Sequence, residues 1–402
     1  MSEVQKPLQR LPMELLRWIL ASLPDIQSLA SAALSCRSLY WAFKYSEDGL
    51  IKDVLVNCMG FDVPPEAIIA VQFHPSFVGN EMKQYCDNLT ESELEEGRWA
   101  IDMVNHADFF TRNLKRPNTS AGLTMRDALA LSNFHLHVVE KLMERFLQAC
   151  KLAPLPSSFL HKNVLCPGPV TWTEKERIVR AFYRFELLWK LFGCFERYLI
   201  DSIPRISRFY YYALYDIIGT FLSKFAPWEN LQLGCIHDFL ASQVFSAFND
   251  ASKRDTIWAQ FGPNFKKPDP SVPVNQFFMT LGPEMILKIA SCVSDTVHET
   301  LLPVKDNCPN LFQQAFRNIQ KPWDSAGNIL NGPPFGEDED SGPKDFWERF
   351  QEEYVLLMLD SYEGAECRHR RWGCGMWDRE RLEALGALEM PLGDDEGWES
   401  FT

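Results

Sequence analysis

The sequence predicts an all-α (mainly α-helical) fold, with an N-terminal three-helix unit followed by a large, irregular helical body. Apolar residues recur at spacings of three and four along most of the 402-residue chain, which is the period of a helix. Runs rich in β-branched residues are scarce, and aromatic residues make up 13% of the composition, which suits thick packing of helix on helix. The hydrophobic fraction of 46% is typical of a globular chain.

The N-terminal unit is predicted over residues 8–58. Pro12 opens its first helix, because a proline costs nothing in a first turn, where its missing N–H would have no partner. One apolar stripe follows at positions i, i+3, i+4 and i+7, formed by Leu16, Ile19, Leu20 and Leu23. Pro24 ends this helix and Asp25 caps a second helix, which we expect to continue to Phe43. A weakly patterned third helix is expected within residues 46–58.

The helical body is predicted over residues 66–330. Residues 66–73 form either a short strand or a helix. A capping-box pattern, Thr173 with Glu176, predicts the start of another helix. The remaining helices with clear periodicity are expected at residues 123–151, 173–200, 228–248 and 283–301. An acidic Pro/Gly loop at 331–343 then leads to a C-terminal helical segment, 344–402, that is expected to pack on the body.

The charge is negative and uneven. The chain carries a net charge of −14, of which residues 337–402 supply −12 through 19 acidic and 7 basic residues. This balance argues against a nucleic-acid or anionic-membrane surface. No run of about 20 apolar residues and no signal peptide is visible, so we expect no membrane span. Eleven cysteines without a CxxC pair predict reduced thiols, in cytosol or nucleus.

No catalytic motif is present: the chain lacks a phosphate loop, a GxGxxG turn, a nucleophile elbow and HExxH. We therefore predict no enzymatic activity and no cofactor. His135 and His137 would point about 200° apart on a helix and cannot share a metal, so one is expected to be buried and one exposed.

The segment around residue 370 also falls short of a metal site. Cys367, His369 and Cys374 lack a fourth ligand. The neighbouring arginines, which are Arg368, Arg370 and Arg371, are expected to pair with carboxylates; binding of phosphate or nucleic acid is the alternative. Trp372 and Trp377 are expected to anchor the C-terminal segment on the body, with an aromatic recognition site as the alternative.

About 45 residues near the N-terminus, within residues 8–58, resemble the F-box family. The ordered matches are Leu11-Pro12, Glu14, Leu15-Leu16, Ile19-Leu20, Leu23-Pro24-Asp25, Ser28-Leu29, Ala33-Leu34, Cys36-Arg37 and Leu39-Tyr40. Leu39 stands where the family often has tryptophan, and Ala30 to Ala33 is rich in small residues. Two further stretches, Thr173 to Gly193 and Arg370 to Gly386, look like stretches that recur in uncharacterised F-box-like proteins of filamentous fungi.

The resemblance implies a substrate-recognition adaptor of a cullin-RING ubiquitin ligase. F-boxes dock on the Skp linker subunit, and through it on the cullin, while the rest of the chain binds a protein target, here unknown. The residues expected to contact the linker are Leu11, Pro12, Leu15, Leu16, Ile19, Leu20, Leu23, Pro24 and Leu29. The alternative is a non-catalytic interaction protein whose F-box-like helices belong to its own core and do not bind the linker.

Overall fold

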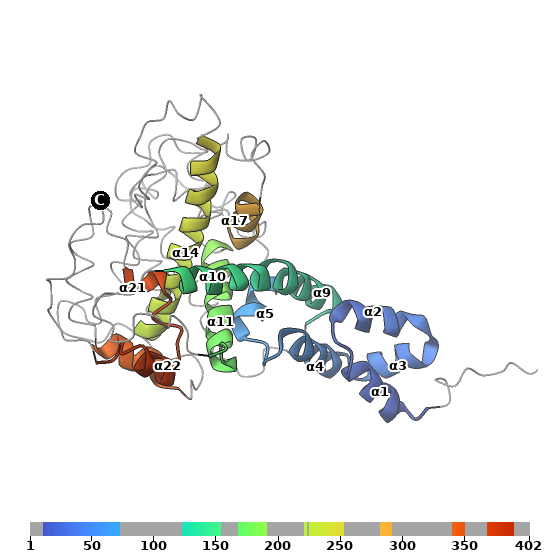
Figure 1. The fold of residues 1–402 in the computed structure, drawn as a ribbon. Coiled ribbons are helices and arrows are strands. Elements are labelled where there is room, and N and C mark those ends of the chain that lie inside the picture. Colours follow the sequence, from blue (N-terminus) through green and yellow to red (C-terminus); the bar gives the residue numbers. More distant parts are fainter. Residues whose placement is uncertain are drawn as a thin grey trace, which may run out of the picture. The chain divides into compact units, whose positions relative to one another are not determined.

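The computed structural model describes residues 11–72, 123–153, 168–190, 221–222, 225–252, 282–291, 340–349 and 368–389 (Figure 1). Regular secondary structure in these residues is helical and includes no strand, which confirms the mainly α-helical prediction for this part of the chain. The chain divides into two compact units. The first unit comprises residues 1–73 and 112–141, and the second comprises residues 74–111 and 142–402.

The described part of the first unit holds six α-helices and one π-helical turn. They are α1 (Met13–Ala21), α2 (Ile26–Ser35), α3 (Arg37–Tyr45), α4 (Glu47–Met59), α5 (Pro65–Gln72), α9 (Met125–Phe134) and η2 (His135–Val139). Helices α1 and α2 pack on α3 and α4, and α9 packs on α2, α4 and α5. The first unit therefore extends well past residue 58 and includes a helix from beyond residue 120.

The prediction of one continuous second helix from Asp25 to Phe43 is wrong, because the helix is interrupted at Cys36. Asp25 does cap α2 as predicted, and its side chain accepts a hydrogen bond from the backbone N–H of Ser28 at 2.7 Å. Cys36 is extended (φ −157°), so that α2 ends before it and α3 begins after it. A new apolar set, Leu39, Ala42 and Phe43, then faces the core at its own i, i+3, i+4 spacing.

The ambiguous segment at residues 66–73 is resolved as helix α5, and its side chains from Glu66 to Ala70 are buried. The long helix predicted at 123–151 is found as α9, η2 and α10 (Glu140–Leu152) in succession. The turn η2 places His135 inside, only 1% exposed, with its ring edge-on to Phe61 at 6.1 Å between centroids. His137 is exposed, so the predicted split between the two histidines is confirmed.

The second unit is built around a buried helix, α11 (Trp172–Leu188), which packs on α14 (Pro227–Ser252) and α17 (Gly282–Ser291). Two short C-terminal helices, α21 (Arg368–Arg371) and α22 (Arg379–Ala384), also belong to this unit, as do most of α10 and a helical stretch at residues 342–349, and α21 packs on α14. Rings of Phe146, Phe182 and Phe239 meet edge-on, with centroids 5.3 to 6.5 Å apart. Such edge-to-face packing is the favoured geometry of aromatic cores.

The start of α11 differs from its prediction by two residues. The cap is Thr171, whose hydroxyl accepts from the backbone N–H of Glu174, while the Glu174 carboxylate accepts from the backbone N–H of Thr171. Two capping-box patterns overlap in this stretch, and the upstream pair is the one formed.

Of the predicted loop at 331–343, residues 331–339 lie outside the described residues, as do 350–367 and 390–402 of the C-terminal segment. No described helix is long and apolar enough to cross a membrane.

Candidate functional site

Exposed apolar side chains gather on the first three helices of the chain. Among the described residues, ten large hydrophobic side chains are exposed: Met13, Leu15, Trp18, Ile19, Leu34, Tyr40, Trp41, Tyr45, Leu152 and Trp172. Eight of the ten lie between residues 13 and 45. Scattered exposed hydrophobic residues need no explanation, whereas a concentration of them is a feature of interaction surfaces.

Helix α1 carries half of this surface. Leu15, Trp18 and Ile19 occupy positions i, i+3 and i+4, so they share one face of the helix, and they are 44%, 75% and 39% exposed. Pro12, one turn before Leu15, is also exposed. We call these four residues the α1 stripe. The other side of α1 is buried, with Leu16 and Leu20 at 2% and 0% exposure, and the helix packs on α3 and α4 through it.

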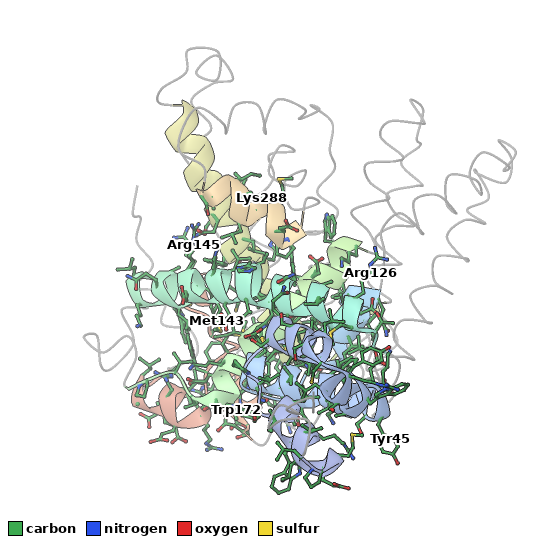
Figure 2. The ribbon with its side chains drawn as sticks, turned by 90° about the vertical axis from the view of Figure 1, so that its right-hand side faces the viewer. Tyr45, Arg126, Met143, Arg145, Trp172 and Lys288 are labelled. Atoms are coloured by element: carbon green, nitrogen blue, oxygen red, sulfur yellow. The ribbon has the colours of Figure 1, made fainter. Side chains whose placement is uncertain are left out.

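A second exposed face lies on α3 and is aromatic. Tyr40 and Trp41 meet edge-on at 5.7 Å between ring centroids, and Tyr45 is 79% exposed at the end of the helix (labelled in Figure 2). Lys44 on the same helix forms an ion pair with Glu47 at 2.6 Å. Tyrosine and tryptophan are enriched at protein interfaces, because each ring offers a large contact area and a polar edge.

The nine residues predicted to contact a linker fall into three groups. Pro12, Leu15, Ile19 and Pro24 are exposed, Leu11 and Leu23 are half-buried, and Leu16, Leu20 and Leu29 are buried. Leu16, Leu20 and Leu29 are at most 2% exposed and pack in the unit's own core, whereas Ile19, from the same predicted stripe as Leu16 and Leu20, is 39% exposed. Only the exposed and half-buried members are open to another molecule in the folded unit.

Sequence reasoning missed the aromatic members of this surface. Trp18 lies three residues after Leu15, and that spacing was enough to place it on the exposed face. Tyr40 and Trp41 could not be placed without knowing that the helix breaks at Cys36, since the break changes which residues of α3 face the core. The spacing predicted helix α1 correctly; of the residues expected to contact a linker, Leu15 and Ile19 lie on its exposed face, while Leu16 and Leu20 lie on its buried face.

The second unit contains a buried ionic cluster that joins two segments far apart in the sequence. We call it the α11 clasp, formed by Glu174, Arg177, Asp378 and Arg381. Arg381 donates to both carboxylate oxygens of Glu174, at 2.6 and 2.8 Å. Arg177 donates to Asp378 at 2.6 Å and to the backbone carbonyl of Met376 at 3.0 Å. Both arginines and Glu174 are almost completely buried, at 0 to 5% exposure.

The surroundings of Asp378 in the α11 clasp shift the pKa of its carboxyl group. Burial alone raises the pKa of its carboxyl group, but hydroxyl hydrogen bonds from Thr171 and Thr173 and the Arg177 guanidinium lower it. The net pKa lies below the ordinary value of 3.8, so Asp378 is ionised at neutral pH. The clasp joins the start of α11 to the residues that begin α22.

The C-terminal segment is anchored as the sequence predicts. Trp372 and Trp377 are each 2% exposed, and the Trp377 indole N–H donates to the carbonyl of Trp372 at 2.8 Å. Arg370 forms an ion pair with Asp238 of α14 at 2.8 Å, so this arginine pairs with a carboxylate of the body rather than of the acidic tail. Gly373 adopts φ +75°, and a Cβ added there would lie 3.1 Å from Cys150 and from Phe146. Both observations explain why this position holds a glycine.

The described residues contain no group of three or more side chains that could hold a metal ion. Cys367 lies outside the described residues, and Cys374 is buried. The cysteines that the structure describes form no disulfide with one another; they are Cys36, Cys58, Cys150, Cys235 and Cys374. No protein-family model matches the chain, and no match was found among curated proteins or among solved structures.

Proposed function

We propose that the chain is a substrate-recognition adaptor of a cullin-RING ubiquitin ligase. The first unit docks on the Skp linker subunit, and the second unit binds a protein target. The observation that carries this proposal is the concentration of exposed apolar side chains on α1 to α3, within the stretch whose ordered Leu-Pro, Leu-Pro-Asp and Cys-Arg matches resemble an F-box.

The α1 stripe has the form of a helix that enters a groove. Such helices present apolar side chains at i, i+3 and i+4 to an apolar channel on the partner, and Leu15, Trp18 and Ile19 have this spacing. Burying these side chains removes apolar surface from water, at about 25 cal/mol per Å². The exposed stripe therefore offers a partner a favourable contact that the first unit itself does not use.

No bond is made or broken by this chain in the proposed role. It holds a target close to the conjugating enzyme and so raises the effective concentration of target lysines there. In this role the adaptor acts in cytosol or nucleus, where thiols stay reduced; the described cysteines form no disulfide with one another.

A binding measurement with purified Skp linker subunit tests the proposal. We expect the Leu15→Asp, Ile19→Asp double variant to lose binding by at least about 100-fold, because two carboxylates would be desolvated in an apolar groove. A matched control is Leu152→Asp, which alters a leucine 73% exposed on the second unit. Wild-type chain that fails to bind the linker at micromolar concentration contradicts the proposal.

The alternative, a helical interaction protein indifferent to the linker, predicts that the double variant and wild type behave alike. The choice of residues matters for this test. Leu16→Asp or Leu20→Asp would place a charge in the core of the unit and abolish binding by unfolding it. Circular dichroism of the Leu15→Asp, Ile19→Asp variant should remain that of the wild type, because both side chains are already exposed.

A further inference from the structure

We draw no further inference here: the strongest candidate, the exposed aromatic patch on α3 formed by Tyr40, Trp41 and Tyr45, belongs to the surface already described, and nothing in the described residues shows what covers it.

Discussion

At the scale of single residues, His135 makes the first unit sensitive to acid. Its ring is buried beside Phe61, and burial lowers its pKa from the ordinary 6.5 to about 4. Its Nε2 atom lies 3.9 Å from a carboxylate oxygen of Glu140. In the folded unit the ring therefore stays neutral to about pH 4. The unfolded chain binds a proton near pH 6.5, so acid favours unfolding.

We expect the free energy of unfolding of the first unit to fall between pH 6.5 and pH 4, by about 2 kcal/mol at pH 5 from this histidine alone. The variant His135→Phe keeps an aromatic ring beside Phe61 but has no proton to bind, so it should lack this dependence. Urea unfolding at pH 7 and pH 5 measures the difference. An equal loss of stability in wild type and variant would show that His135 is not the cause.

At the scale of elements, the α11 clasp has a large effect on the stability of the second unit only because its ion pairs are buried. Removing one partner of a buried ion pair leaves the other charged and desolvated, at a cost of about 3–5 kcal/mol, whereas exposed pairs contribute about 0–1 kcal/mol. Glu174 and Arg381 form such a buried pair. Lys288 and Glu284 form an exposed pair on α17, with both side chains 60% exposed.

We therefore expect Glu174→Gln to destabilise the second unit by about 3–5 kcal/mol, because it leaves Arg381 uncompensated. Adding Arg381→Gln should cost less than the sum of the single changes, since the two residues share their contacts. Thermal unfolding measures all three variants. Glu284→Gln is the control and should change stability by less than about 1 kcal/mol. If the losses of stability from Glu174→Gln and Arg381→Gln were additive, the proposed interaction between these two side chains would be contradicted.

Sequence periodicity predicted helices reliably where an apolar stripe runs without interruption. The stretch from Leu123 to Lys151 and the helix α14 were both found this way. It failed at Cys36, where two short helices have stripes that resemble one longer stripe, and it placed the cap of α11 two residues late. Periodicity also could not show that Glu174 and Arg177 would be buried, because their partners lie about 200 residues away.

At the scale of the whole molecule, the first unit is assembled from two separate parts of the chain. Helices α2, α4 and α5 all pack on α9, which begins at Met125. In α9, Ala128 and Leu131 are buried, and the Cys58 thiol approaches the Ser132 hydroxyl at 3.4 Å. The N-terminal helices alone would thus expose apolar surface that α9 covers.

We expect a chain ending at residue 72 to melt at a lower temperature and to bind more of a hydrophobic dye than one in which a flexible linker joins residue 72 to residues 112–141. The physical reason is the apolar surface of α2, α4 and α5, which only the longer chain covers. Calorimetry and dye fluorescence measure both effects. Equal melting temperatures would show that α9 does not contribute to the stability of the unit.

The α11 clasp also has a consequence for synthesis on the ribosome. The two sides of the clasp are 201 to 207 residues apart in the chain. At about 5–20 residues per second, Glu174 and Arg177 leave the ribosome roughly 10–40 seconds before Asp378 and Arg381 exist. During that interval Glu174 and Arg177 lack their clasp partners, so the clasp forms only when translation is nearly complete. A nascent chain that stalls before residue 378 therefore lacks the ion pairs that join α11 to the C-terminal residues.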